Sequence, residues 1–498
     1  MSTSVCRAAV ISDIHYDATP SSVASRKSEY GAILLRKVVY RLATQIQPDV
    51  VIVLGDLVDK PAAPDAEEKL RELKSILDML KLPVIVIPGN HDPDRAVFNR
   101  VFGPLPDYVD VNGTRFVCFD DEERPGYNAH RSAADIARMH AARSGFDGRL
   151  VALSHVPLFP AGALPSPYHF INDAEVVAAL EMDRYTAAIG GHHHPGSGPS
   201  EVRGVTYVGA PAVCESPFPF LLATFGDDVS IARHELKLPS TLSVWDTHVH
   251  TQFAYCSENM DVRRTLDIAG MMGLAGVCFT EHSLHLYLDK KALSSRDAYA
   301  RGLENPLCTR TRAEGYFELL DREQVALSSR GLETDIDFNG KLILDSRDRT
   351  RVSLLIGSVH EIPEGMKPRT EPVDTARFID EFMATSKKLC ESGIQILAHP
   401  LRMFDRKHLP IPESVIPGLV DMMKTNGVAA EINFHTHNPP VSYVRECIRQ
   451  SVPLAFGSDA HNLYEVGEFS RHIAVVREVG YEGNMEKVLY RFPDAGVV

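Results

Sequence analysis

The chain has 498 residues, of which 44% are apolar and 24% charged, a composition that excludes collagen-like, low-complexity and disordered proteins. This length favours two domains rather than one. Lysine and arginine number 52 against 66 aspartates and glutamates, which gives a net charge of −14. Duplex nucleic acid is therefore not expected as the main partner, because an acidic surface repels its phosphates.

The cysteines and the N-terminal segment indicate the compartment. Eight cysteines occur without a CxxC pair, and their spacing matches neither a disulfide framework nor a zinc ribbon. Residues 1–17 lack the basic and apolar segments of an export signal, and no apolar run reaches the roughly 18 residues of a membrane span. We expect a cytoplasmic protein that does not act at a membrane. The oligomeric state is not predicted.

Short apolar runs alternate with stretches of helical periodicity in the first half of the chain. Five runs are predicted to be buried strands: 8–12, 50–54, 84–88, 150–154 and 186–190. Helical stretches follow the first three strands, at about 25–45, 65–81 and 94–102. These helices are long enough to cover a sheet on both faces, which gives a layered α/β domain over residues 1–240. A closing set of antiparallel strands is expected at 204–209, 218–225 and 229–236.

A second series of apolar runs begins near residue 242. Its seven predicted strands are 242–246, 276–280, 332–336, 354–359, 395–398, 429–432 and 453–458. Helices separate most of them, so residues 241–498 are predicted to form a barrel-like (β/α) domain with its site at the C-terminal ends of the strands. The boundary is expected near Lys237–Ser243. The segment 284–330 fits neither series and is predicted to be an insertion that covers the second site.

Polar motifs follow the five strands of the first domain. They are DIH (13–15), GDLVD (55–59), GNHD (89–92), His155 and GHHH (191–194). Because ligands of open α/β sheets bind beyond the C-terminal ends of the strands, these side chains are expected to converge. Oxygen and imidazole donors without thiolate suit Mn, Fe or Zn, and one carboxylate can bridge two ions.

The order of these motifs resembles that of the calcineurin-like metallophosphoesterases over about 235 residues. The resemblance implies a layered α/β metallophosphoesterase sandwich with two divalent ions. It further implies that Asp13, His15 and His194 hold one ion, that Asn90, His155 and His192 hold the other, and that Asp56 bridges them. His91 is implied to be a catalytic acid outside the ligand set, and His193 is expected to point outward. GNHDPDR is more similar to the cyclic-nucleotide phosphodiesterase branch than to the protein phosphatases.

A second set of histidines and acids follows the strands of the second domain. WDTHVHT (245–251) places His248 and His250 on the same side of a strand end, since side chains two apart share a face. Comparable residues end most of the later strands. The pattern resembles the PHP (polymerase and histidinol phosphatase) family over about 242–498, which implies a distorted (β/α)7 barrel. Nine positions match its ligands: His248, His250, Glu258, His282, Glu333, His360, His399, Asp459 and His461.

The PHP resemblance implies up to three ions, Zn, Mn or Fe. The implied ligands are His248, His250, Glu333 and Asp459 for the first, Glu333, His360 and His399 for the second, and Glu258, His282 and His461 for the third. Glu258 departs from the usual Asp or His, and Cys256 is the competing candidate. A trinuclear site can hold all the oxygens of a terminal phosphate, which favours monoester hydrolysis.

Three arginines lie in or beside the expected site loops and are candidates to bind substrate phosphate: Arg310, Arg312 and Arg402. Arg402, in HPLR, is the preferred one, and the other two are expected to be ordinary solvated arginines. His285, His435 and His437 are not assigned to the site. The pair His435-x-His437 imitates the HxH motif but follows a strand to which no ligand is assigned.

Together the two motif sets predict a bifunctional metal-dependent hydrolase of small phosphate esters. The first domain is expected to cleave a phosphodiester, including a cyclic one, and the second a phosphomonoester. Two alternatives stay open. One is a nuclease for short oligonucleotides, although no basic or aromatic track for a polynucleotide is visible. The other is a catalytic domain joined to a nucleotide-sensing regulatory domain.

Overall fold

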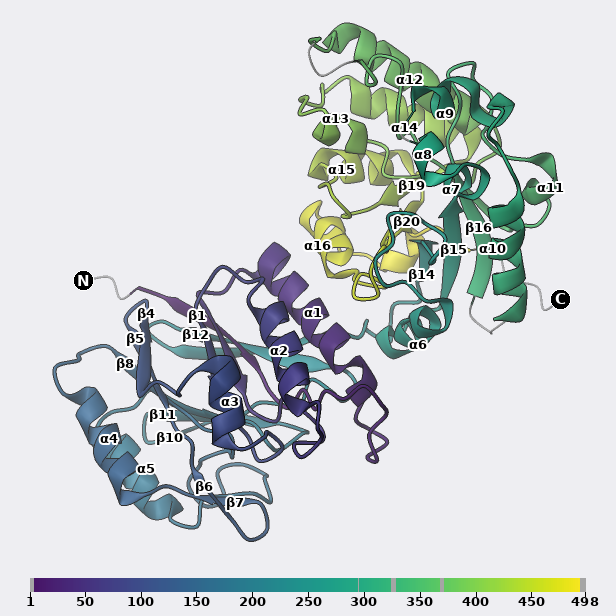
Figure 1. Cartoon of the computed structure of the whole chain (residues 1–498). Helices are drawn as coiled ribbons and strands as arrows, with labels where there is room; N and C mark the ends of the chain where they lie inside the picture. Colours follow the sequence, from purple (N-terminus) through teal and green to yellow (C-terminus); the bar gives the residue numbers. More distant parts are fainter. Residues whose placement is uncertain (1–3, 294, 324–327, 368–370, 493–498) are drawn as a thin grey trace. The chain divides into compact units, whose positions relative to one another are not determined.

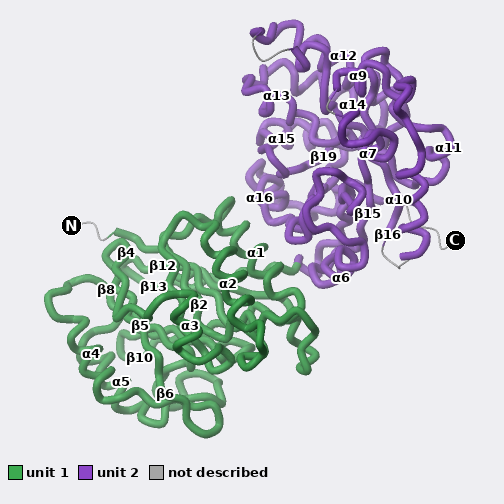
Figure 2. Tube along the Cα trace, in the orientation of Figure 1, with its two compact units in different colours: residues 1–237 green, residues 238–498 purple. Residues whose placement is uncertain are grey.

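The structure is a computed structural model that describes residues 4–293, 295–323, 328–367 and 371–492. The chain forms two compact units, Met1–Lys237 and Leu238–Val498 (Figure 2). Both are α/β units, and each is described by itself below.

Unit 1 contains two large sheets and the two-stranded hairpin of β6 (Glu122–Arg124) and β7 (Asn128–His130) (Figure 1). The first has the order β13 (Val229–Glu235), β12 (Pro219–Phe225), β1 (Cys6–Ile11), β2 (Val50–Leu54) and β3 (Val84–Ile87). The second has the order β10 (Ser197–Val202), β11 (Val205–Gly209), β9 (Ala187–Gly190), β8 (Arg149–Leu153), β5 (Thr114–Cys118) and β4 (Tyr108–Val111). The central strands of both sheets are parallel, and antiparallel strands complete the edges.

The two sheets pack face to face, which makes unit 1 a two-sheet sandwich. Val10 and Ile52 of the first sheet share one buried cluster with Val151 and Ile189 of the second. Helices cover the outer faces: α1 (Gly31–Arg41), α2 (Ala66–Leu77) and α3 (Arg95–Phe102) beside the first sheet, α4 (Ala133–Arg143) and α5 (Asp173–Met182) on the second (Figure 1). Each central strand is covered on both sides, which is why it reads as a continuous apolar run.

Two expectations for unit 1 are wrong. The helices do not cover both faces of one sheet, because a second sheet occupies the inner face. Strand β11 does not join the antiparallel set of β12 and β13, since it pairs in parallel with β9 in the other sheet. Apolar runs reveal that a strand is buried, but not which strand lies beside it. The antiparallel neighbour of β11, the polar strand SGPSEV, has no apolar signal.

Unit 2 contains a seven-stranded parallel sheet in which the strands follow the order of the chain. The strands are β14 (Trp245–Val249), β15 (Gly276–His282), β16 (Ser328–Thr334), β17 (Leu354–Gly357), β18 (Ile396–Leu397), β19 (Ala429–Ile432) and β20 (Leu454–Phe456). Beyond β20, the Asp459 N–H donates to the His248 carbonyl and the His250 N–H to the Ala460 carbonyl. The last strand thus lies beside the first, and the barrel is nearly closed, as in a (β/α)7 barrel.

Helices connect the strands of the barrel. The principal ones are α6 (Val262–Met272), α10 (Thr311–Arg322), α12 (Thr375–Glu391), α14 (Val415–Asn426), α15 (Val441–Gln450) and α16 (Ser470–Glu478). The segment predicted as an insertion forms α7 (Ser283–Tyr287), α8 (Lys290–Leu293), α9 (Arg296–Arg301) and α10, while α11 (Ser346–Arg349) and α13 (Arg402–Arg406) are short. The hydroxyl of Tyr316 in α10 donates to the carbonyls of Phe279 and Gly331, which attaches α10 to the barrel.

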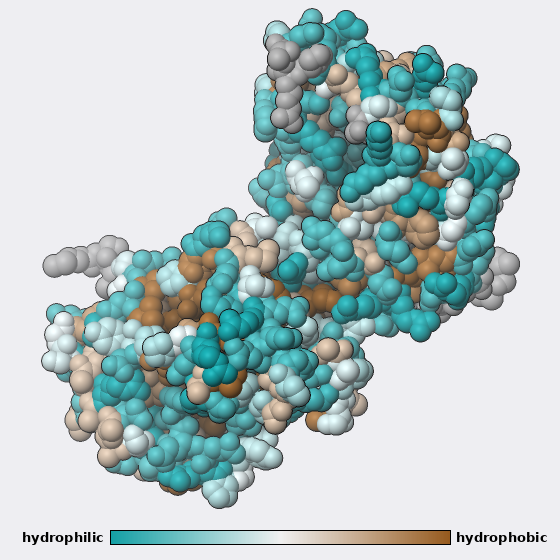
Figure 3. Space-filling view, in the orientation of Figure 1, coloured by the Kyte–Doolittle hydropathy of each residue, from teal (hydrophilic) through white to brown (hydrophobic). Residues whose placement is uncertain are grey.

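Hydrophilic side chains dominate the face of each unit seen in Figure 3. Among the helices of the described residues, none combines the length and the apolar character that crossing a membrane requires.

His472 on α16 is buried without a charged partner and tests the core of unit 2. Its ring lies about 5 Å from the rings of Phe434, Phe456 and Phe469, and Nε2 lies 3.2 Å from the Gly457 carbonyl. Burial lowers the pKa of His472 from 6.5 to about 4. The folded protein therefore keeps this imidazole neutral at a pH where the unfolded chain binds a proton. The resulting stabilisation is complete above about pH 6.5 and is lost as the pH falls towards 4.

His472→Gln keeps a donor for the Gly457 carbonyl but cannot titrate. We expect the stability advantage of the wild type over this variant to fall by about 2 kcal/mol between pH 7 and pH 5, from the pKa difference between the two states. Urea unfolding of both proteins after removal of metal ions measures it, because other pH-dependent contributions cancel in the difference. An advantage that stays constant with pH would contradict a neutral buried imidazole.

Candidate metal centres

Seven of the predicted ligands of unit 1 converge at one end of the sandwich. This first cluster comprises Asp13, His15, Asp56, Asn90, His155, His192 and His194. They follow the C-terminal ends of β1, β2 and β3 in one sheet and of β8 and β9 in the other. Because the two sheets pack face to face, their strand ends supply donors from both sides.

One donor set contains Asp13, His15 and His194. The two Nε2 atoms lie 3.2 Å apart, and Asp13 Oδ1 lies 3.6 Å from that of His194 and 4.0 Å from that of His15. Asp13 Oδ1 is buried and makes no hydrogen bond. A buried carboxylate oxygen without a hydrogen-bond donor, beside two imidazole nitrogens, fits a divalent cation.

The second donor set contains Asn90, His155 and His192. His155 Nε2 lies 3.0 Å from Asn90 Oδ1 and 3.1 Å from His192 Nδ1. Asp56 stands between the two sets, with Oδ1 3.3 Å from His155 Nε2 and Oδ2 3.5 Å from His15 Nε2. One oxygen towards each set is the arrangement of a carboxylate that bridges two ions.

Acceptors behind the rings fix which nitrogen faces the cluster. The Nδ1 atoms of His155 and His194 lie 2.7 Å from the Leu54 carbonyl and 2.8 Å from Glu215, and that of His15 lies 3.5 Å from Asp59. The Leu54 carbonyl and Glu215 hold the Nδ1 protons of His155 and His194, so the Nε2 lone pairs of these two rings point into the cluster. His192 instead presents Nδ1, and burial lowers its pKa to about 3, which keeps the ring neutral at physiological pH.

His91 and His193 line the cavity of about 460 Å³ at the first cluster. The backbone N–H of His91 donates to Asp56 Oδ1 at 2.7 Å, and its Nδ1 lies 3.2 Å from the Asp59 carbonyl. This position beside the bridging carboxylate suits a proton donor to a bound ester. The expectation that His193 points outward is wrong, because the backbone turn after Gly191 directs its side chain to the cavity wall near Tyr168.

Four supporting residues of unit 1 were not predicted. Glu215 and Asp59 hold two of the ligand imidazoles, and Arg26 donates to Asp59 at 3.1 Å. Asp92 accepts from the backbone N–H groups of Leu57 and Gly89, which ties the GD and GN turns together. Burial, aided by the charge of Asp56, raises the pKa of Asp92 to about 7. Asp59 and Asp92 end the quoted motifs and could have been found, whereas nothing in the sequence marks Arg26 or Glu215.

Eight of the nine predicted ligands of unit 2 also converge. This second cluster comprises His248, His250, His282, Glu333, His360, His399, Asp459 and His461. Glu333 lies at its centre, with Oε1 2.8 Å from His399 Nε2 and 3.4 Å from His360 Nε2. Asp459 Oδ1 lies 2.9 Å from His250 Nε2 and 3.4 Å from His248 Nε2. His248 Nε2 is buried and makes no hydrogen bond, which fits a metal ligand.

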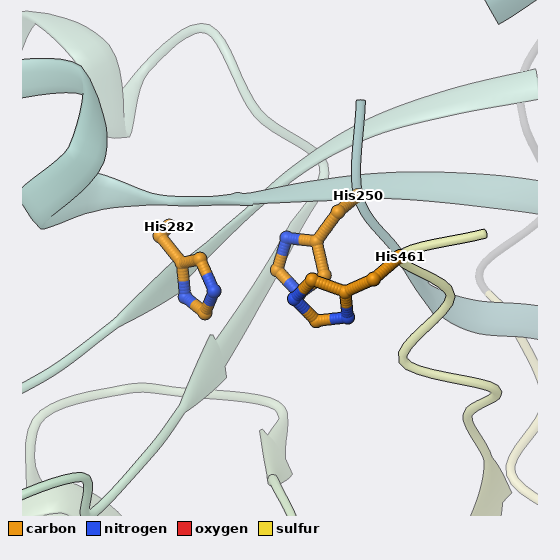
Figure 4. A group of neighbouring side chains, drawn as sticks. All are labelled: His250, His282 and His461. Carbon is orange, nitrogen blue, oxygen red and sulfur yellow. The ribbon is translucent and has the colours of Figure 1, made fainter. Parts of the chain in front are cut away.

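A further donor set contains His250, His282 and His461, whose rings come from three separate segments and group together (Figure 4). His461 Nδ1 lies 2.7 Å from the Asp459 carbonyl, and His282 Nδ1 lies 2.5 Å from Glu333. Held in this way, both rings have Nε2 free for a ligand. Burial lowers the pKa of His461 to about 2, so this ring is neutral.

The ninth predicted ligand differs from the other eight. Glu258 and Cys256 are both exposed and both line the cavity, and Cys256 Sγ lies 3.6 Å from His282 Nε2. The contact with His282 is thus made by Cys256, the competing candidate, because the turn after Thr251 brings Cys256 next to β15.

Buried acids behind the second cluster were not predicted. Glu431 lies 2.7 Å from His248 Nδ1, Glu281 3.3 Å from His250 Nδ1, and Asp335 2.9 Å from His360 Nδ1. A Cβ at Gly457 would collide with Glu431, so only glycine fits there. A charged residue within the apolar run AAEI could have identified Glu431.

Of the other histidines and arginines considered in the sequence analysis, some line the cavity at the second cluster and some do not. His435, which was not assigned to the site, stacks on His461 at 4.6 Å and lines the same cavity of about 410 Å³, as does His285. Arg402 also lines it and donates to Asp459 Oδ2 at 2.7 Å. Arg310 instead pairs with Asp348, and Arg312 donates to backbone carbonyls.

Comparison with known proteins shows what the first unit is similar to. Residues 6–196 match the family model of the calcineurin-like phosphoesterases. A probable phosphatase of Acetivibrio thermocellus is 27% identical over 161 residues, which is 30% of this chain, and a probable cyclic nucleotide phosphodiesterase of Rhodococcus erythropolis is 26% identical over 190 residues, which is 36%. The chain spans 59% of the length of each relative.

Two solved structures resemble about half of the chain more distantly. A dimetal phosphatase from Danio rerio is 17% identical, with a TM-score of 0.41 over 47% of this chain and 96% of its own. The purple acid phosphatase PPD1 from yellow lupin seeds is 12% identical, with a TM-score of 0.35 over 47% of this chain and 52% of its own. The family match covers most of unit 1, which is therefore similar to the calcineurin-like phosphoesterases over residues 6–196.

Glu215→Ala tests whether the acceptors behind the rings matter for ion binding. We expect this variant to hold metal about 10- to 100-fold more weakly in unit 1, because His194 loses the partner that fixes its tautomer. Competition with a chelator, followed by elemental analysis, measures the affinity. Glu201→Ala removes an exposed acid of β10 as a matched control. Equal affinities of the two variants would show that Glu215 does not orient a ligand.

Proposed function

We propose that the chain is a bifunctional metal-dependent phosphoester hydrolase. Unit 1 cleaves a phosphodiester, including cyclic ones, with two ions of Mn, Fe or Zn. Unit 2 acts as a PHP-type phosphatase that removes phosphate from a monoester with up to three ions of the same kinds. The observation that carries the proposal is common to both units: imidazole nitrogens, several of them oriented by an acceptor behind the ring, surround a central carboxylate.

The bound ions would supply Lewis acidity and a water molecule with a lowered pKa. In unit 1, the chain's own contribution is the placement of Asp56 between the two donor sets and of His91 at the cavity wall. His91 is held through Nδ1, which leaves Nε2 to exchange a proton with the ester oxygen that departs. Asn90 contributes an uncharged ligand oxygen, which limits the negative charge near an anionic substrate.

In unit 2, Arg402 adds a cation at the edge of the second cluster. Its guanidinium is anchored by Asp459 and lines the cavity, so the remaining N–H groups can bind phosphate oxygens. More imidazoles and a fixed arginine suit the dianion of a monoester. Hydrolysis of a diester yields such a monoester, and the product of unit 1 therefore has the chemistry that unit 2 accepts. A small phosphate ester fits both the cavity volumes and the net charge better than duplex nucleic acid.

Asp56→Asn and Asp459→Asn test the division of labour. The first change should abolish hydrolysis of bis-p-nitrophenyl phosphate and spare that of p-nitrophenyl phosphate, because it removes the bridging charge in unit 1 only. The second should do the reverse. Steady-state rates of the metal-replete proteins measure both, with Asp228→Asn, an exposed aspartate, as the control. Loss of both activities in either single variant would contradict separate sites.

The proposal also covers the third ion of unit 2, which we infer to be held by Cys256 together with His282 and His461. The support is the contact of 3.6 Å between Cys256 Sγ and His282 Nε2. A thiolate ligand gives Co²⁺ a charge-transfer band in the near ultraviolet. Cobalt-loaded wild type and Glu258→Gln should show this band, and Cys256→Ser should lose it. A band that survives in Cys256→Ser, or is missing from the wild type, would rule the thiolate out.

A further inference from the structure

Two tyrosines stand on one side of the first cavity and take no part in the donor sets. The ring of Tyr168 lies 4.2 Å from the ring of His192 at an interplanar angle of 60°, and the ring of Tyr127 lies 6.3 Å from it at 49°. Both line the cavity that contains Asp56, Asn90 and His91. Two aromatic rings thus flank the position where an ester would meet the first cluster.

The β6–β7 hairpin and the segment that pairs with it carry both tyrosines. Tyr127 lies in the turn between β6 (Glu122–Arg124) and β7 (Asn128–His130), and Tyr168 precedes a segment that pairs with β7. The Ala129 N–H donates to the His169 carbonyl at 3.0 Å, and the Ile171 N–H donates to the Ala129 carbonyl at 2.8 Å. These backbone bonds fix the distance of the two tyrosines from each other.

The end of the β6–β7 hairpin is anchored in the core. Arg131, directly after β7, is fully buried and pairs with Asp121 through two hydrogen bonds of 2.8 Å. Its guanidinium lies 3.6 Å from the ring centre of Phe119 and 5.2 Å from that of Phe170. An anchored support holds the tyrosines in place before a ligand arrives, which lowers the entropic cost of binding.

Tyr127 occupies an unfavourable conformation without a compensating contact in the core. Its φ is +60° and follows a φ of +80° at Gly126, and 56% of the residue is exposed. A bulky side chain in the left-handed region is an outlier, where Gly, Asn or Asp is usual. An exposed ring gains little from burial. The hairpin turn accounts for the positive φ, so the feature that points to a function is the exposed ring at the edge of the cavity, where Gly, Asn or Asp would satisfy the turn with less strain.

We propose that Tyr127 and Tyr168 form a binding face for the planar base of a nucleotide, so that the diester substrate of unit 1 is a mononucleotide derivative. This inference rests on the proposed diesterase function. Aromatic side chains stack on any nucleobase, whatever its hydrogen-bonding edge. The cavity of about 460 Å³ suits a single nucleotide. The net charge of −14 disfavours a long polynucleotide.

Two diesters that differ only in the base test the proposal. They are adenosine 5′-(methyl phosphate) and the analogue in which a methoxy group replaces adenine. In the metal-replete wild type, kcat/KM should be higher for the base-bearing ester. Tyr127→Asn and Tyr168→Leu should each lower this ratio by roughly 5- to 150-fold, which is the strength of a base stacked on an aromatic ring. Asparagine tolerates the left-handed backbone, so the hairpin keeps its turn.

Tyr127→Phe and Tyr168→Phe are the matched controls, and they should keep the wild-type ratio because the ring is retained. Titration calorimetry of AMP against ribose 5-phosphate, in proteins that also carry Asp459→Asn so that unit 2 does not hydrolyse these monoesters, should show the same loss of preference in the Asn and Leu variants. Equal kcat/KM for the two esters in the wild type, or an equal loss of both esters in the variants, would overturn the base-binding face. Hydrolysis of neither ester would instead refute the diesterase function itself.

Discussion

A neutral imidazole has one lone pair and one N–H, so a histidine can face a cation only if its proton is held elsewhere. Both clusters meet this constraint with acceptors placed behind the rings. Glu215 and the Leu54 carbonyl do so in unit 1, and Glu431, Glu281 and Asp335 do so in unit 2. These acceptors fix the tautomers before any ion binds, and their burial depends on the sandwich and the barrel around them. The chemistry of the two sites therefore depends on residues that do not belong to either donor set.

The backbone at the strand ends supports the same interpretation. Six residues of the two clusters adopt positive φ although none is glycine: Asp13, His15, Asp56, His192, His399 and Asp459. Such conformations cost on the order of 1 kcal/mol each and persist only when the surroundings enforce them. A turn that bends immediately after a parallel strand directs its side chain over the end of the sheet. The fold thus accepts local strain where donors must converge.

The sequence was most informative where chemistry and strand position coincide. Continuous apolar runs located the central strands of both units, and histidines or acids directly after them located the donor sets. The resemblance implied a sandwich for unit 1, but the apolar runs alone could not show its two sheets, because burial does not name a partner and β10 carries no apolar pattern. The supporting acids were missed for a related reason. Glu215 lies in an irregular loop, so only the folded chain brings it within 2.8 Å of His194.

Anomalous diffraction from crystals of the metal-replete protein tests the central claim most directly, since it locates ions without reference to activity. The account predicts two peaks on either side of Asp56 and up to three around Glu333 and Asp459. An absence of peaks from either cluster, with ions bound elsewhere or not at all, would contradict it.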